Sequence, residues 1–433
     1  MEPITIGTIS LVLFFLLVVL GMPIGFTFAT VGFFGFALVR NLEAALNLLG
    51  SVPYTWGSTY TMIVIPLFVL MGQFAFHSGI SGDLYNAAYK WVGRLPGGLA
   101  LATNLACTGF AACTGSSLAS AATMGTIAIP EMKKFDYHPR LATGCVAAGG
   151  TLGILIPPSI IFIIYGVLTG TSIGKLFIAG IFPGILLSLL FSALIYIMCR
   201  RNPKLGPRGS SFSWREKLIS LRGVGGMLLL FFLVIGGIYG GIFTPTEAGA
   251  TGALGAFLIL LLRGRITWEV LISSLRDTVR TTAMIFMILI GAQIFNGFLA
   301  LSGIPATIAR WIGELSFSPY TILSIILFVY IPLGMIMDSL PMILLTLPTI
   351  FPIILRLGFD PVHFGVLLCV MCELANISPP MGMNLYIIKG VAKDVRLEEI
   401  IFGAFPFMIV MLVCVAILIL LPWINLFLPG LMK

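Results

Sequence analysis

Long apolar segments without charged residues dominate this chain, and they constrain its fold more than any other feature. Residues 177–198, 224–242 and 401–428 are three examples. A helix needs about 20 consecutive apolar residues to cross a bilayer, so each of these segments is long enough. Only 9% of the 433 residues are charged, against roughly 25% in soluble proteins. The chain is therefore expected to lie in a membrane.

The apolar runs predict an all-α polytopic membrane protein. Outer-membrane barrels show alternating segments of about ten residues, whereas these runs are unbroken. They fall at 4–20, 22–39, 60–80, 98–130, 142–169, 177–198, 224–242, 246–262, 281–301, 320–355, 364–390 and 401–428. The runs 98–130 and 320–355 are too long for one helix, and small or polar clusters interrupt them. We expect these two to be re-entrant helical hairpins beside ten transmembrane helices.

The basic residues predict which side of the membrane each loop occupies. The linker 199–222 holds one acidic residue, Glu216, and seven basic ones: Arg200, Arg201, Lys204, Arg208, Arg215, Lys217 and Arg222. Cytoplasmic loops are enriched in Lys and Arg, so this linker is expected in the cytoplasm. Counting crossings from it places 19 of 24 basic residues inside and both termini on the periplasmic side. The net charge of +8 is thus interpreted as an orientation signal and not as a nucleic-acid surface.

Proline spacing reveals an internal repeat. At a spacing of 222 residues Pro23 matches Pro245, and the same spacing relates Pro130 to Pro352, Pro139 to Pro361, Pro157 to Pro379 and Pro158 to Pro380. We expect one repeat over 1–200, the cytoplasmic linker 199–222, and a second repeat over 223–433, each with scaffold helices. Under the topology above, corresponding segments run in opposite directions. Inverted repeats with interrupted helices are typical of secondary transporters.

The two Pro-Pro pairs predict broken helices within 142–169 and 364–390. Proline cannot donate the helical hydrogen bond, and it disfavours a helical residue before it, so we expect breaks near 153–156 and 375–378. The second half-helix then directs its positive N-terminus at the break, while the carbonyls that end the first half offer ligands to a cation. A simple proline kink is the structural alternative.

The hairpin tips supply the strongest candidate residues. Ser116 and Asp338 occupy corresponding positions, and each is expected to cap the returning helix of its hairpin. A lone carboxylate in an apolar segment is costly unless it pairs with a cation, so sodium or a proton is the expected partner of Asp338. Asp338 could instead only cap a helix in a wet crevice. Glu373 is either a second coupling carboxylate or a hydrogen-bonded strut.

These features define two sets of candidate site residues at the tips and breaks. The predicted cation-binding residues are Asp338, Ser116, Gly153, Ser339 and Asn376. The predicted substrate-binding residues are Ser117, Thr114, Thr151, Ser378 and Asn384. Neither a nucleotide-binding loop nor an H-x-x-x-H or C-x-x-C-H spacing occurs, and the C-x-x-C pair Cys369 and Cys372 lies in an apolar helix without a second pair. We therefore expect no enzyme activity, no transition metal and no cofactor other than Na⁺ as coupling ion.

Four segments make the chain similar to one known family. They are CTGSSLASAATMG (113–125), GGTLGILIPPS (149–159), GMIMDSLPMILLTLPTIFPI (334–353) and ELANISPPMGMNLY (373–386). With them the chain resembles the large membrane subunit of the tripartite ATP-independent periplasmic (TRAP) transporters, of the dicarboxylate-permease M type. Where the family usually has G-L-I-T-P-P, this chain has Ala375-Asn376-Ile377-Ser378-Pro379-Pro380. Asn376 could alter cation coordination at this position.

The resemblance implies a transporter of the bacterial inner membrane that uses an elevator mechanism. In this mechanism the hairpins and broken helices move together against a scaffold formed by the remaining helices. The resemblance also implies a periplasmic substrate-binding protein and a small four-helix membrane subunit as partners. The expected function is sodium-driven uptake of a small organic anion, such as a C4-dicarboxylate, sialic acid or a similar carboxylate. A stand-alone sodium/anion symporter of the same architecture is the alternative. A proton-conducting respiratory subunit would need more buried ionisable residues, and a structural scaffold would not need Asp338.

Overall fold

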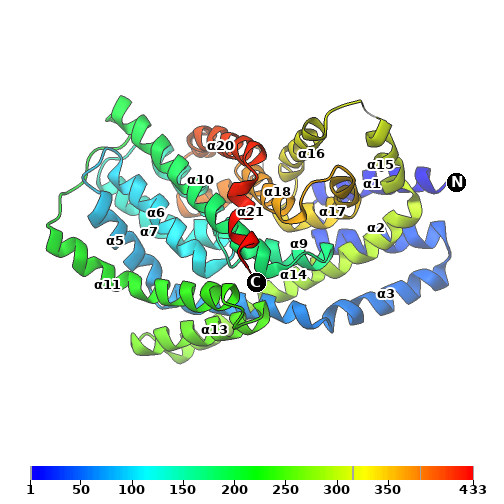
Figure 1. The fold of residues 1–433 in the computed structure, drawn as a ribbon, viewed down its shortest axis with the longest axis horizontal. Helices are drawn as coiled ribbons and strands as arrows, with labels where there is room; N and C mark the ends of the chain where they lie inside the picture. Colours follow the sequence, from blue (N-terminus) through cyan, green and yellow to red (C-terminus); the bar gives the residue numbers. More distant parts are fainter. Residues whose placement is uncertain (1, 315, 381, 433) are drawn as a thin grey trace.

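The computed structural model describes residues 2–314, 316–380 and 382–432 as helices and short connections, without a strand (Figure 1). Seven helices in these ranges are long and apolar enough to cross a membrane, or eight if the bent pair α8 and α9 forms one span. The all-α polytopic fold is thus confirmed. The first helices of the chain, α1 and α2, have 17 and 16 residues and fall just below that length. Ten crossings therefore stay a prediction.

The helices fall into two successive sets. The first set is α1 (Pro3–Val19), α2 (Ile24–Val39), α3 (Leu42–Gly57), a 3₁₀ turn (Tyr60–Ile63), α4 (Val64–His77), α5 (Ile80–Val92), α6 (Gly98–Thr114), α7 (Ser117–Lys134), α8 (Pro139–Leu155), α9 (Ile160–Thr169) and α10 (Ile173–Arg201). The second set is α11 (Trp214–Phe231), a π-turn (Phe232–Gly236), α12 (Gly237–Tyr239), α13 (Pro245–Leu262), α14 (Trp268–Ser302), α15 (Ile304–Glu314), α16 (Pro319–Gly334), α17 (Ser339–Arg356), α18 (Pro361–Asn376), α19 (Met383–Val391), α20 (Leu397–Leu420) and α21 (Trp423–Gly430).

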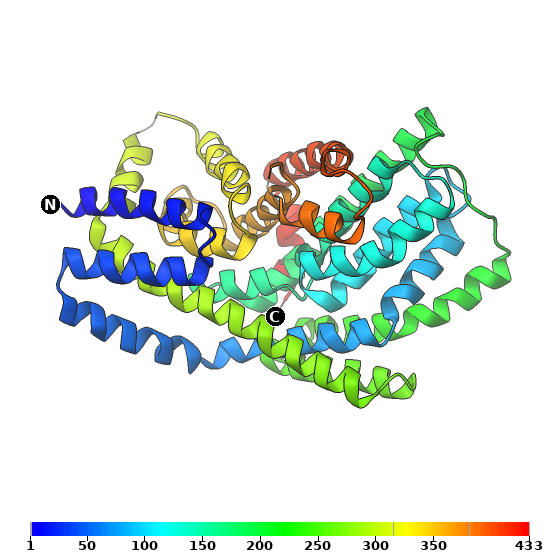
Figure 2. The same ribbon diagram turned by 180° about the vertical axis from the view of Figure 1, so that it is seen from behind.

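The order of elements repeats along the chain. A helical hairpin is followed by a broken helix and then a long helix, first as α6–α7, α8–α9 and α10, and again as α16–α17, α18–α19 and α20. We call α6–α7 hairpin 1 and α16–α17 hairpin 2. The two hairpins lie toward opposite ends of the molecule, with α10, α18 and α21 between them (Figures 1 and 2).

Each hairpin turns at a capped tip, as the sequence predicts. Gly115 ends α6 in the left-handed conformation (φ 63°), which favours glycine, and Ser116 caps α7 by accepting a hydrogen bond from Ala119 N (3.3 Å). Asp338 caps α17 by accepting a hydrogen bond from Ser339 N (2.7 Å). The capping prediction for Ser116 and Asp338 is therefore confirmed.

The breaks in α8–α9 and α18–α19 lie later than expected. Helix α8 continues through the predicted break to Leu155, and only Ile156, the residue before the prolines, becomes extended (ψ 123°). Helix α9 then starts at Ile160 after the cap Ser159, which accepts from Phe162 N. The steric effect of proline falls mainly on the residue directly before it, which explains why the preceding turn stays helical. Both Pro-Pro bonds are cis.

A long side of the molecule is formed by α3, α11, α13 and α14 (Figures 1 and 2). Helix α14 has 35 residues, more than the 281–301 expected, and packs closely on α2. A Cβ placed on Gly32 would lie 2.6 Å from Phe295 Cα, so this crossing requires glycine. Helix α3 was missed because polar residues at a spacing of four, such as Glu43, Asn47 and Ser51, interrupt the apolar run in its sequence. We call the set α1–α4, α13 and α14 the scaffold.

The basic linker is partly helical and is held against hairpin 1. Helix α11 begins at Trp214, within the expected loop, after a capping box of Ser213 and Glu216. The hydrogen bonds from Ser213 lower the pKa of the Glu216 carboxyl. Gly97 N donates to Gly206 O (3.1 Å), which ties the loop to the start of α6. The linker therefore has a defined path across the open end of hairpin 1.

Candidate functional site

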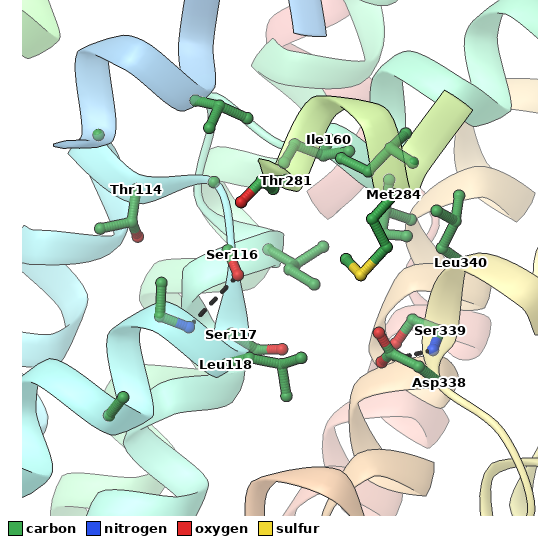
Figure 3. Close-up of a pocket in the computed structure, with 18 of the residues that line it drawn as sticks. Thr114, Ser116, Ser117, Leu118, Ile160, Thr281, Met284, Asp338, Ser339 and Leu340 are labelled. Carbon is green, nitrogen blue, oxygen red and sulfur yellow. Dashed lines mark hydrogen bonds between the residues drawn. The ribbon is translucent and has the colours of Figure 1, made fainter. Parts of the chain in front are cut away.

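A cavity of about 290 Å³ lies between the tips of the two hairpins (Figure 3). Its lining comes from the hairpin tips, from the break between α8 and α9, and from the scaffold helices α4 and α14. Ser116 and Ser117 lie on one side of the gap, and Asp338 and Ser339 lie on the other. Elements from both halves of the chain therefore build one site.

Three helix N-termini meet at this cavity. Its lining includes Leu118 in the first turn of α7, Ile160 at the start of α9, and Leu340 in the first turn of α17. A helix N-terminus carries a partial positive charge and unpaired backbone N–H groups, so each one attracts an anion. Among the described lining residues none is Lys, Arg or His. The cavity can thus receive an anion without a basic side chain.

Asp338 provides the one charged side chain among the described lining residues. It is half-buried, and its carboxylate accepts the capping bond from Ser339 N. No described Lys, Arg or His lies within ion-pair distance of it. A carboxylate in this setting is stabilised by a cation, and oxygen atoms are the ligands that sodium requires. The tip of hairpin 2 therefore fits a small cation.

Behind the tip of hairpin 2 lies a buried polar cluster centred on Glu373. Its Oε1 accepts hydrogen bonds from Ser339 Oγ and Asn376 Nδ2 (3.3 Å each), and Asn376 Nδ2 also donates to Ser339 Oγ (2.8 Å). Two atoms of the cluster have no hydrogen-bond partner among the described residues: Glu373 Oε2 and Asn376 Oδ1. The cluster therefore keeps free oxygen atoms close to Asp338.

Gly153 packs against the tip of hairpin 1 without lining the cavity. A Cβ at this position would lie 2.6 Å from both Ser116 O and Ser120 Oγ. The predicted residues Thr114, Ser116, Ser117, Asp338 and Ser339 do line it.

The other predicted residues do not reach the cavity wall. Asn376 belongs to the Glu373 cluster just described. Thr151 Oγ1 donates to Ala148 O (2.6 Å) and Ser378 Oγ donates to Leu374 O (2.8 Å), so both hydroxyls bond to helix backbone. Asn384 Nδ2 reaches Ala147 O (3.4 Å) in α8. Thr151, Ser378 and Asn384 are all fully buried. Their substrate-binding role stays a prediction. In this structure the bonds of Thr151 and Ser378 are local, and the bond of Asn384 joins α19 to α8.

Two scaffold residues of the site were missed from the sequence. Gln73 of α4 and Thr281 of α14 line the cavity opposite the hairpin tips. Gln73 is a lone amide in the apolar stretch VLMGQFAF, which is a signal that could have identified it. Thr281 stands among other polar residues near the start of its run, so its position gives no such signal. Both residues present polar groups to the cavity from the scaffold.

Comparisons with known proteins find matches over most of this chain. The family "Tripartite ATP-independent periplasmic transporter, DctM component" matches residues 11–424. The C4-dicarboxylate TRAP transporter large permease protein DctM of Pseudomonas aeruginosa is 40% identical over 372 residues, 86% of each chain. The sialic acid TRAP transporter large permease protein SiaM of Vibrio cholerae is 33% identical over 421 residues, 95% of each chain.

Among solved structures, the crystal structure of the Alcanivorax borkumensis YdaH transporter shares the fold with a TM-score of 0.65. It covers 90% of both chains at 16% sequence identity. The family match and the relatives each span most of the chain. This chain therefore belongs to the DctM component family of the tripartite ATP-independent periplasmic transporters, which are membrane transport proteins and not enzymes.

Proposed function

We propose that this permease takes up a small organic anion together with sodium. The observation that carries the proposal is the cavity where three helix N-termini and the Asp338 carboxylate meet without a basic side chain. The N-termini of α7, α9 and α17 would hold the anion, each contributing roughly 0.3–1 kcal/mol. A sodium ion at Asp338 would neutralise the carboxylate, which otherwise repels the anion. Sodium and substrate therefore bind together better than either binds alone.

The substrate would be a small carboxylate. The cavity of about 290 Å³ lies at the lower end of the range of roughly 300–1,000 Å³ typical of ligand pockets. One of the similar proteins is a C4-dicarboxylate permease and another is a sialic acid permease. The volume favours a compound of about four carbon atoms over a nine-carbon sugar acid. Competition of transport by succinate and by sialic acid would separate these two sizes.

The transport step would be an elevator movement. The hairpins and broken helices would move as one body against the scaffold, because the cavity lies at the boundary between these two groups of helices. Hairpin 1 and hairpin 2 would serve as gates on opposite sides, with the linker in the cytoplasm and both termini in the periplasm. Labelling of single cysteines placed in the linker and at Pro3 in intact cells tests this orientation.

The partners would be a small membrane subunit and a periplasmic substrate-binding protein, as the tripartite family description implies. The test is uptake into proteoliposomes that contain this chain, a candidate small subunit and a candidate binding protein. We expect uptake that requires all three proteins and an inward sodium gradient. Equal uptake with a potassium gradient would overturn sodium coupling. Full uptake by this chain alone would instead favour a stand-alone symporter.

A further inference from the structure

Among the described residues, one hydrogen bond joins the scaffold to the middle of hairpin 2. Asn296 of α14 donates from its Nδ2 to the carbonyl oxygen of Leu344 in α17, over 3.3 Å. In a regular helix the Leu344 carbonyl would accept from the N–H of residue 348, but that residue is Pro348 and has no N–H. Asn296 therefore supplies the donor that the proline removes.

This replacement matters because Leu344 is buried in an apolar segment. A backbone carbonyl without a partner is costly where water is scarce. In membrane proteins, side chains of neighbouring helices commonly satisfy carbonyls that a proline has freed. The contact is thus a specific one between two helices that the proposed elevator would move past each other.

The same face of α14 holds further unused hydrogen-bonding capacity. Gln293 lies three residues before Asn296, so the two amides share one helix face. Gln293 Nε2 and Asn296 Oδ1 are buried and have no partner among the described residues. In α17, Pro352 likewise leaves the Pro348 carbonyl without its helical donor. Asn296 thus contacts a helix in which two carbonyls, one turn apart, lack their helical donor, and Gln293 offers a second donor on the same face of α14.

The repeat itself does not account for these amides. At the 222-residue spacing, Asn296 corresponds to Phe74 and Gln293 to Met71, and both of those side chains are buried and apolar. In hairpin 1, Pro130 frees the Thr126 carbonyl of α7, yet no described side chain donates to it. The polar contact is therefore specific to hairpin 2 and α14.

We propose that Asn296 is a positioning residue that latches hairpin 2 to the scaffold through the Leu344 carbonyl, with Gln293 as a second donor when this bond opens. The inference rests on the proposed function, because a latch matters only if hairpin 2 moves. The latch consists of one interhelical hydrogen bond. One bond of this kind changes the equilibrium between the latched and released positions of hairpin 2 roughly 2- to 10-fold. Such a bond holds one position of the hairpin and still allows it to leave.

A double substitution tests the latch. Asn296→Leu removes the donor, whereas Pro348→Ala returns an N–H to α17 and satisfies the Leu344 carbonyl within its own helix. We expect Asn296→Leu to decrease the population of the latched position by roughly 2- to 10-fold. Pro348→Ala alone should also lower this population, because the Leu344 carbonyl then no longer needs Asn296, and adding Asn296→Leu to Pro348→Ala should lower it little further. If Asn296 acts only through packing, Asn296→Leu will cause the same loss in the Pro348→Ala background as in the wild type, and the proposal is wrong.

The readout is the distance between spin labels at Leu301 in α14 and Leu355 in α17, both partly exposed. The seven native cysteines are buried, so two engineered cysteines can be labelled. Thr282→Val is the matched control, since Thr282 is another α14 residue whose buried polar atom has no described partner. It should leave the distances unchanged. An equal shift in the control would overturn the proposal.

This readout does not depend on transport. A protein that fails to use sodium can still show the latch, and a sodium-driven transporter can lack it, so the two failures are distinguishable. If Asn296→Leu does not fold, Asn296→Ala is measured instead, and the apparent melting temperatures of both single variants and the double variant form a cycle. Additive effects in that cycle would contradict a bond between Asn296 and the Leu344 carbonyl.

Discussion

The two hairpins share one plan of helix, capped tip and returning helix, but they differ in charge. The tip of hairpin 1 ends in the hydroxyl of Ser116, whereas the tip of hairpin 2 ends in the carboxylate of Asp338. Each cap performs the same local task of satisfying the first N–H groups of a helix. The repeat thus supplies two tips of similar geometry. The carboxylate of Asp338, in place of a hydroxyl such as that of Ser116, makes only the tip of hairpin 2 suited to a cation.

The largest expected effect comes from removing that charge. Asp338→Asn keeps the cap but removes the carboxylate, so we expect sodium-driven uptake to fall by roughly 100-fold. Ser116→Ala removes only a neutral cap and should lower uptake by roughly fivefold. Initial uptake rates in proteoliposomes measure both, with the exposed Glu43→Gln as control. Equal losses at the two tips would erase the distinction between the hairpins.

Close packing behind each tip predicts the next effect. Gly153 contacts the backbone of hairpin 1, and Gly334 of hairpin 2 contacts Ala375 in α18, so a Cβ at either position meets atoms at 3.0 Å or less. We expect Gly153→Ala and Gly334→Ala each to cost about 1–3 kcal/mol through overpacking. Apparent melting temperatures report this cost. Gly390→Ala is the control, because a Cβ there meets no atom within 4 Å. A stable Gly153→Ala protein would contradict the packing argument.

A substitution at Glu373 tests whether a second carboxylate behind hairpin 2 takes part in sodium coupling. Glu373→Gln keeps an oxygen that can accept from Ser339 and Asn376 but removes the charge. We expect the sodium concentration for half-maximal uptake to rise only roughly fivefold, since a neutral acceptor is weaker than a charged one. Sodium titration of uptake measures it. A loss as large as that of Asp338→Asn would mean that Glu373 carries coupling and is more than a strut.

The smallest effect is expected at the hairpin bases. Lys133 at the end of α7 pairs with Asp394 (2.6 Å), and this bond holds the pKa of the Asp394 carboxyl below its usual value. A carboxyl whose pKa is lowered by folding stabilises the folded protein when the pH is above the usual pKa of that carboxyl. This contribution is lost as the pH falls through the lowered pKa.

Lys133→Gln should therefore lower the apparent melting temperature slightly at neutral pH and not at acid pH. Melting curves of this variant and of the wild type across that pH range measure the difference. In hairpin 2, Arg356 makes no ion pair within the described ranges, so Arg356→Gln is the matched control. If the melting temperatures of the two variants depend on pH in the same way, the bases of the two hairpins do not differ in this respect.

Much of the architecture follows from local chemistry that the sequence displays. The Pro-Pro pairs predicted two broken helices because proline acts on the residue beside it, and both breaks lie a few residues later than predicted. The caps Ser116 and Asp338 were predicted because capping needs only a short polar side chain ahead of an apolar run. These features depend on neighbours in the sequence.

The cavity walls depend on neighbours in space, and this explains what was missed. Nothing along the chain indicates that Gln73 and Thr281, on helices from different repeats, face the same gap. Thr151 was predicted at the site from its distance to the break, yet its hydroxyl bonds to the backbone of its own helix. Helix α3 was missed because an amphipathic helix with few buried residues gives no continuous apolar run.

The three helix N-termini around the cavity have a consequence for how such a permease changes its substrate. A backbone N–H cannot be removed by exchanging a side chain, so point mutations leave this source of attraction for anions in place. If the proposed function holds, the shape of the cavity and the side chains around it can vary while the attraction of the backbone for a carboxylate remains. Selection could then exchange one acid for another without altering the backbone groups that hold it.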